Sequence, residues 1–172
     1  AAGISTLMIE KDSPGISFGA QEKKMGWNSQ PTAQVIFEDC RVPIKNLLGN
    51  EGDGFKIAMK GLDGGRLNIA ACSLGTAQSA FERSVEYVGD REQFGKKIQD
   101  FQSIQFKLAD MATELEASRL MLRTAANKVD KNTPDKTKSA AMAKRFVTDL
   151  GFKIVNEALQ IHGGYGYLKD YP

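Results

Sequence analysis

Hydrophobic residues recur at three- and four-residue steps through most of the chain, which is the spacing of amphipathic helices. The first such segment runs from Phe55 to Val88 and is followed by Gly89-Asp90, a helix stop signal. The second runs from near Asp100 to Val129. The third follows Thr133-Pro134, a start signal, and stops at Gly163-Gly164. Three long helices with short connections predict most of an up-down four-helix bundle.

The first helix is expected to bury a single apolar stripe and to begin at an acidic cap. Asp53 comes directly before the periodic segment, so its side chain is a candidate N-cap. The predicted stripe consists of Phe55, Met59, Leu62, Ile69, Leu74, Phe81, Val85 and Val88.

Residues 1–46 have a different pattern, that of short strands separated by turns. The apolar and β-branched runs are residues 4–9, 15–19 and 33–40, and Pro43 ends the last one. So few strands do not make a stable sheet with closed edges. We expect a mainly α chain with two parts. Residues 1–46 would be the last strands of a β-barrel or β-sandwich domain, and residues 47–172 an incomplete helical bundle domain.

Three glycines interrupt the first helix. Gly61, Gly64 and Gly65 each cost about 1 kcal/mol relative to alanine in a helix interior. Asp63 and Arg66 lie three residues apart and share their face. One interpretation is a flat window of small residues that admits a ligand between one negative and one positive group. The other is a tight helix–helix crossing with a surface ion pair.

Composition excludes several classes of function. The net charge of +2 arises from interspersed acids and bases, so nothing predicts a nucleic-acid partner. No apolar run has membrane-spanning length. Cys40 and Cys72 have neither metal nor redox spacing and are expected to be free thiols. His162 is the single histidine, so it cannot assemble an ordinary zinc site, and a packing or capping role is the commoner one for such a residue.

Two weaker patterns leave a cofactor site open. Residues 163–166, Gly-Gly-Tyr-Gly, follow a helix rather than a strand, which excludes a Rossmann fingerprint but still allows close approach to the backbone. Arg91 and Phe94 share a polar loop and could meet a pyrophosphate and a flat ring. A solvated arginine is the alternative.

The order of several segments resembles the acyl-CoA dehydrogenase family, over the whole length of the chain. The matching segments are residues 26–32, 35–43, 51–55, 91–96, 101–111 and 160–166. Within the family, residues 26–32, 61–66 and 163–171 look most like the branch that acts on short, branched acyl-CoA such as isobutyryl-CoA.

The resemblance implies roles for individual residues. Substrate acyl-CoA would be contacted by Asp63, Gly64, Gly65 and Arg66. FAD would be held by Arg91, Phe94, Gln102, Gln160, Ile161, His162, Gly163 and Gly164. The first three of these cofactor residues usually serve the flavin of a neighbouring subunit.

The reaction implied by the resemblance is α,β-dehydrogenation of an acyl thioester, with a carboxylate base and a flavin as hydride acceptor. In the isovaleryl and long-chain branches of the family the base glutamate occupies the position of Gly65, and in the others it lies beyond residue 166. No catalytic residue is therefore assigned in this chain, and no metal is expected. We expect the chain alone, as a fragment, to be inactive and to bind FAD weakly or not at all.

The resemblance also implies a homotetramer, electron-transfer flavoprotein as partner, and the mitochondrial matrix as location. The alternative is a non-catalytic helical module that keeps the family's framework for binding or assembly.

Overall fold

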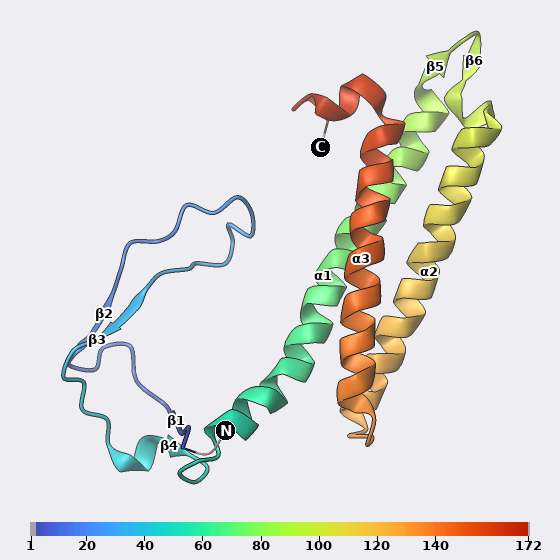
Figure 1. Ribbon diagram of the computed structural model, residues 1–172. Coiled ribbons are helices and arrows are strands. Elements are labelled where there is room, and N and C mark those ends of the chain that lie inside the picture. The colour runs from blue at the N-terminus through green and yellow to red at the C-terminus, as the bar shows by residue number, and fades with distance from the viewer. Residues whose placement is uncertain (1–2, 172) are drawn as a thin grey trace. The chain divides into compact units, whose positions relative to one another are not determined.

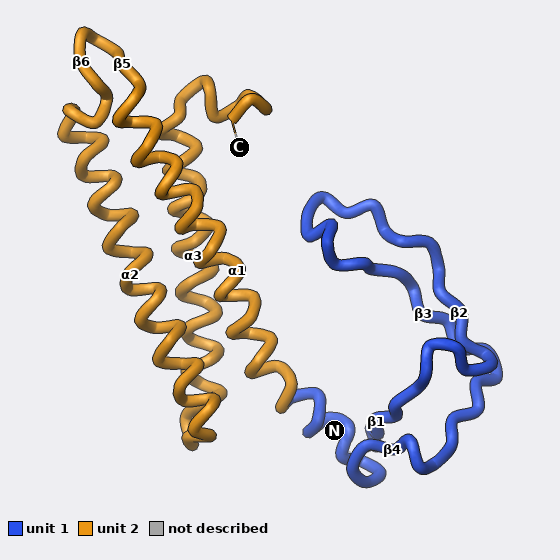
Figure 2. Tube along the Cα trace, turned by 180° about the vertical axis from the view of Figure 1, so that it is seen from behind, with its two compact units in different colours: residues 1–59 blue, residues 60–172 orange. Residues whose placement is uncertain are grey.

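The computed structural model of the chain describes residues 3–171, which fall into two compact units. The units divide between Met59 and Lys60 (Figure 2). Each unit is described by itself below. The predicted domain boundary between residues 46 and 47 lies before this division and stays a prediction.

The first unit contains short antiparallel strand pairs. Its elements are β1 (Thr6–Leu7), β2 (Ile16–Phe18), β3 (Val35–Phe37), a 3-10 helix (Ile44–Asn46) and β4 (Leu47–Leu48). β1 pairs with β4 and β2 with β3, as two separate two-stranded sheets (Figure 1). The three predicted strands are present but shorter than their apolar runs. β4 was not predicted. Two-stranded sheets are marginal on their own, so apolar residues such as Val35 and Phe37 stay about half exposed.

Asp53 stands at the predicted capping position, directly before α1, but its side chain bonds to the preceding turn and not to the helix. Its Oδ2 accepts hydrogen bonds from the Asn50 backbone N–H at 3.1 Å and from the Asn50 amide at 3.2 Å, so the carboxylate serves the preceding turn. Its backbone carbonyl accepts from Ile57 N–H at 3.0 Å and so begins the helix. The two Asn50 hydrogen bonds favour the charged carboxylate and lower the pKa of Asp53 below its ordinary value of 3.8.

The second unit is built from three long helices, as predicted. They are α1 (Gly54–Asp90, whose start belongs to the first unit), α2 (Gln102–Asp130) and α3 (Lys136–Ile161). Figures 1 and 2 show them side by side along their lengths. Among residues 3–171, no helix is both long and apolar enough to cross a membrane.

The start of α3 differs from the prediction. It begins at Lys136 rather than at Pro134, because Thr133 and Asp135 are used in the turn itself. The Thr133 hydroxyl donates to Asp135 Oδ1 at 2.9 Å, and Lys128 on α2 donates to Asp135 Oδ2 at 2.5 Å. These bonds fix the connection between the two helices.

The buried face of α1 is not the predicted stripe. Of that stripe, Leu74 and Val88 are buried and Phe81 packs against the core, but Phe55, Met59, Leu62, Ile69 and Val85 are 36–44% exposed. The residues that are buried instead are small or polar, and they continue the three- and four-residue steps: Asp63, Ala70, Ala77 and Ser84. Small side chains let neighbouring helices approach, and on the buried face of α1 they alternate with the larger Leu74, Phe81 and Val88.

The helices α1 and α3 approach each other closely at Gly151. A Cβ placed there would overlap with Ser73 Oγ. By contrast, Gly61, Gly64 and Gly65 have no atom within 4 Å of such a Cβ. These three glycines therefore do not form the tight helix–helix crossing that was one interpretation of them. The Asp63–Arg66 ion pair that belonged to this interpretation is present. Between α2 and α3, the ion pairs Lys107–Glu157 and Lys153–Glu114 flank the packed core.

Candidate functional site

The segment between α1 and α2 is a β-hairpin rather than the predicted loop. β5 (Glu92–Gln93) pairs with β6 (Lys96–Lys97), and a 3-10 helix (Ile98–Asp100) leads into α2. The two turn residues, Phe94 and Gly95, have φ of 55° and 78°. Two positive φ values in a two-residue turn define the type I′ hairpin, in which Asn-Gly is preferred.

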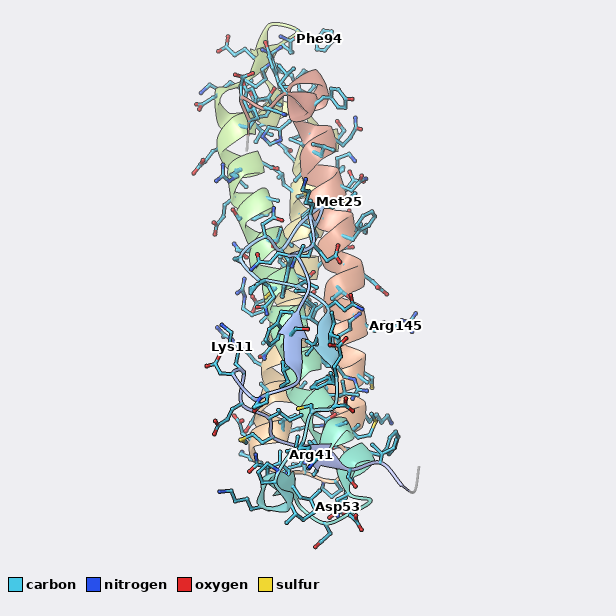
Figure 3. All side chains as sticks on the ribbon, turned by 90° about the vertical axis from the view of Figure 1, so that its left-hand side faces the viewer. Lys11, Met25, Arg41, Asp53, Phe94 and Arg145 are labelled. Carbon is cyan, nitrogen blue, oxygen red and sulfur yellow. The ribbon has the colours of Figure 1, made fainter. Side chains whose placement is uncertain are left out.

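Phe94 is an unusual residue for this turn. Its left-handed backbone is unfavourable for a bulky side chain, and the residue is 93% exposed. Figure 3 shows it at the end of the bundle, pointing away from the helices. Among the described residues, the Phe94 ring has one aromatic neighbour, Phe101, which it meets edge-to-face with the ring centroids 6.3 Å apart. A strained and exposed aromatic is typical of a residue that contacts a ligand or another chain.

A second turn lies at the same end of the bundle, directly after α3 (Figure 1). Residues Gly163–Tyr167 form a short 3-10 helix. Open space surrounds Gly163 and Gly164, whereas a Cβ at Gly166 would lie 2.7 Å from the Leu159 carbonyl. The first two glycines therefore expose backbone to a ligand, and the third lets the turn pack on α3.

Aromatic rings connect this turn to α1. Tyr87 stacks on His162 with ring centroids 4.3 Å apart, and Tyr171 meets both rings nearly edge-on. Burial raises the pKa of Tyr87, with nearby Arg91 opposing the shift, so the phenol stays protonated. Its hydroxyl lies 3.4 Å from the His162 carbonyl. His162 Nδ1 lies 2.8 Å from the Ala158 carbonyl, which can only accept, so Nδ1 carries a proton.

Arg91 is held by its backbone while its guanidinium remains available. Its N–H donates to the Tyr87 carbonyl and its carbonyl accepts from Ile98 N–H, each at 2.9 Å. The guanidinium lies 4.9 Å from the centre of the Tyr165 ring. Within the described part of the chain it makes no ion pair and no side-chain hydrogen bond. Its N–H groups can therefore meet an anionic ligand while one face stays on tyrosine.

These groups surround one cavity of about 650 Å³. The cavity is lined by the hairpin, the start of α2 and the turn after α3. Of the residues predicted to hold the cofactor, those lining it are Arg91, Phe94, Ile161, His162, Gly163 and Gly164. Gln102 and Gln160 do not line it, and both are exposed on the outer surfaces of α2 and α3.

The lining fits an elongated cofactor that carries phosphates and flat rings. Arg91 offers unpaired donors to a phosphate, Gly163 and Gly164 leave backbone uncovered, and Phe94 and Tyr165 offer ring faces. FAD combines these features. Residues 3–171 contain no group of three histidine, cysteine or acidic side chains that could hold a metal ion.

The residues predicted to contact substrate form a second group, nearer the N-terminal end of α1. Asp63 is buried and accepts from Arg66 Nη1 at 2.9 Å and from the Thr137 hydroxyl at 2.7 Å. Arg66 is partly exposed, and Gly64 and Gly65 beside it face open space. The glycines and Arg66 are thus accessible, whereas Asp63 is enclosed.

Sequence reasoning missed several residues of the two groups. Tyr87 lies one helical turn before Arg91, a spacing that puts both on one face and could have suggested a shared role. Tyr165 stands in the recognised glycine-rich turn but received no role. Thr137 carries no local signal, because its partner Asp63 is 74 residues away in sequence.

Comparison with known proteins identifies the family of the chain. The family model of the acyl-CoA dehydrogenase C-terminal domain matches residues 52–172. The mitochondrial isobutyryl-CoA dehydrogenase of Dictyostelium discoideum is 56% identical over 99% of this chain and 41% of its own length.

Solved structures agree as well. Butyryl-CoA dehydrogenase from Megasphaera elsdenii matches with a TM-score of 0.95 and 47% identity, over 99% of this chain and 44% of that one. A chain in the structure of the electron transferring flavoprotein of Acidaminococcus fermentans matches with a TM-score of 0.94 and 50% identity, over the same shares of the two chains. The chain spans about two fifths of the length of these relatives. With a matching domain model and similarity over nearly the whole of this chain, it belongs to the acyl-CoA dehydrogenase family of FAD-dependent oxidoreductases.

Proposed function

We propose that this chain supplies the C-terminal part of a flavoenzyme that removes hydrogen from Cα and Cβ of a short or branched acyl-CoA, with isobutyryl-CoA the preferred type. The observation that carries the proposal is the meeting of Arg91, Phe94, His162 and the open Gly163-Gly164 backbone around one cavity. The name of the Dictyostelium discoideum relative supports the choice of substrate.

In this proposal the residues at the cavity bind and orient FAD. Arg91 pairs with phosphate, Phe94 and Tyr165 cover ring faces, and Gly163 and Gly164 permit close approach. Gln102 and Gln160 stay candidates for cofactor binding. Because they lie outside the cavity, they could contact only a part of the cofactor, or of a neighbouring subunit, that also lies outside it. FAD, when bound, supplies the acceptor for two electrons.

At the substrate group, the glycine window admits the thioester chain along α1, and Arg66 binds an anionic or polar group of CoA. Asp63 belongs to this group through Arg66, because it is itself enclosed. No residue of this chain is proposed as the catalytic base, and Gly65 offers no acid at its position. The proposed protein is a homotetramer of the mitochondrial matrix that delivers electrons to an electron-transfer flavoprotein. The name of the mitochondrial relative supports the location, and the name of the Acidaminococcus fermentans structure supports the electron acceptor. The homotetramer is proposed from the family resemblance alone.

The deciding experiment is an anaerobic titration of the flavin in the full-length protein with isobutyryl-CoA and, separately, with butyryl-CoA. Bleaching of the flavin absorbance is expected with both, and at lower concentration with isobutyryl-CoA. A flavin that binds but stays oxidised with every acyl-CoA would instead support the non-catalytic module.

A matched pair of arginine variants tests the cofactor site. Arg91→Gln is expected to lose FAD during gel filtration, because no other guanidinium lines the cavity. Arg145→Gln removes an arginine that is exposed on α3 and pairs only with Asp149, so FAD should be retained (Figure 3). Equal retention of FAD by both variants would reject the role of Arg91.

A further inference from the structure

Asp63 uses both of its carboxylate oxygens, and one of them connects α1 to α3. Oδ1 accepts from Arg66 Nη1 at 2.9 Å on the same helix, and Oδ2 accepts from the Thr137 hydroxyl at 2.7 Å across the bundle. Only 5% of Asp63 is exposed. A carboxylate this enclosed needs partners for both oxygens, and each of its two partners comes from a different helix.

The pairing of Asp63 with Arg66 is monodentate. A guanidinium has five N–H donors and readily forms two parallel bonds to a carboxylate whose oxygens are both free. Here the second oxygen is occupied by Thr137. Among the described residues, the bond to Asp63 is the one hydrogen bond of the Arg66 side chain, which is one third exposed. The remaining donors of Arg66 are therefore free beside the open surface of Gly64 and Gly65.

We infer that Thr137 is a positioning residue for substrate binding: by holding Oδ2 of Asp63, it keeps Arg66 in the monodentate pair and leaves its other donors for an anionic group of CoA. The inference rests on the proposed function, in which Arg66 contacts acyl-CoA. Without the hydroxyl, Asp63 can turn both oxygens toward Arg66. The guanidinium then donates two hydrogen bonds to Asp63 and rotates out of the orientation that meets the ligand.

The test uses the full-length flavoenzyme and three variants. Thr137→Val removes the hydroxyl at constant shape, and Thr137→Ser retains it. Thr148→Val is the matched control, because the Thr148 hydroxyl bonds only to carbonyls of its own helix, those of Lys144 and Arg145. Two quantities are measured for each: the Kd for CoA by calorimetry, and KM and kcat for isobutyryl-CoA.

Thr137→Val is expected to raise both the Kd for CoA and the KM by about tenfold, the size of one hydrogen bond to a charged group, with kcat within about twofold. Thr137→Ser and Thr148→Val should match wild type. In an Arg66→Gln background, Thr137→Val should change the Kd by less than about twofold, because its effect passes through Arg66. If Thr137 served only in packing, the effect of Thr137→Val would persist in the Arg66→Gln background.

Unchanged Kd for CoA in Thr137→Val overturns the inference, as does an equal loss with and without Arg66. If the valine variant does not fold, Thr137→Ala removes the same hydroxyl without a methyl against Asp63 and carries the same comparison. Failure of the proposed function is distinguishable: the wild-type flavin would not bleach with any acyl-CoA, while calorimetry with CoA would still decide the role of Thr137.

Discussion

Two serines buried in the bundle differ in one hydrogen bond. Ser84 on α1 and Ser118 on α2 are 0% and 2% exposed. The Ser84 hydroxyl donates to the Ala80 carbonyl at 2.9 Å. The Ser118 hydroxyl has no partner among the described residues. A buried hydroxyl without a partner has lost its hydration and gained nothing in return.

We expect Ser118→Ala to raise the free energy of unfolding by about 1 kcal/mol, since it removes the unpaired hydroxyl and improves helix propensity. Ser84→Ala is the matched control and should be neutral or destabilising by up to about 1 kcal/mol, because it gives up a bond. Urea denaturation of the chain measures both. A loss of stability in Ser118→Ala would show that its hydroxyl has a partner after all.

Gly151 allows α3 to approach α1 at Ser73, and this contact predicts a coupling between the two residues. Gly151→Ala gains about 1 kcal/mol of helix propensity but meets the Ser73 hydroxyl. In a Ser73→Ala background the obstacle is gone. The alanine at position 151 should therefore stabilise the Ser73→Ala protein and not the wild type, as a double-mutant cycle in urea would show. Additive effects would contradict the contact.

Among the elements, the β5–β6 hairpin combines a strained turn with an exposed ring. Phe94→Asn installs the residue preferred at φ above zero and is expected to raise the thermal midpoint of the bundle. It also removes the ring from the cavity, so FAD retention by the full-length protein should fall. Glu92→Gln, in the same hairpin, is the control, because Glu92 neither forms the turn nor lines the cavity. Phe94→Asn with unchanged FAD retention would mean that the ring serves no cofactor.

The connection between α2 and α3 predicts a pH dependence. Hydrogen bonds from Lys128, and then from Thr133, lower the pKa of Asp135 below its ordinary value of 3.8. A carboxyl whose pKa falls on folding stabilises the fold above its unfolded pKa, and this stabilisation disappears as the pH drops through the lower folded value.

Asp135→Asn should therefore lower the thermal midpoint at neutral pH, and its difference from wild type should shrink below about pH 4. Asp149→Asn is the control, because its pair with Arg145 is long and exposed and contributes little. Thermal scans from pH 3 to 7 measure both. A difference that stays constant with pH would reject the ionic origin.

For the whole molecule, apolar surface remains uncovered on the bundle. Phe152 and Leu159 on α3 are 78% and 53% exposed and border a second cavity of about 310 Å³. We expect the chain, purified alone, to associate at micromolar concentrations. Replacing both residues by serine should shift it toward the 18.8 kDa monomer in light scattering, whereas Met25→Ser in the first unit should not. A monomer at all concentrations would contradict this expectation.

How far the sequence predicts the structure depends on whether a feature is local. The helices and the ends of α1 follow from periodicity and stop signals. The buried face of α1 does not, because Ala70, Ala77 and Ser84 are covered only through the other helices. The hairpin was hidden by a phenylalanine where asparagine is usual. Thr137 was hidden by its distance in sequence from Asp63. Most of the proposed cofactor residues came from the family resemblance, and their meeting at one cavity depends on the fold.

A single helix, α1, carries Arg66 of the substrate group and ends at Asp90, directly before Arg91 of the cofactor group. Arg66 and Arg91 are 25 positions apart, which corresponds to about 37 Å along a helix. The number of residues between Arg66 and Arg91 sets this distance. One inserted residue would turn one end by about 100° relative to the other. We therefore expect an insertion within this interval to misalign the two binding groups, whereas a longer loop outside it would leave their separation unchanged.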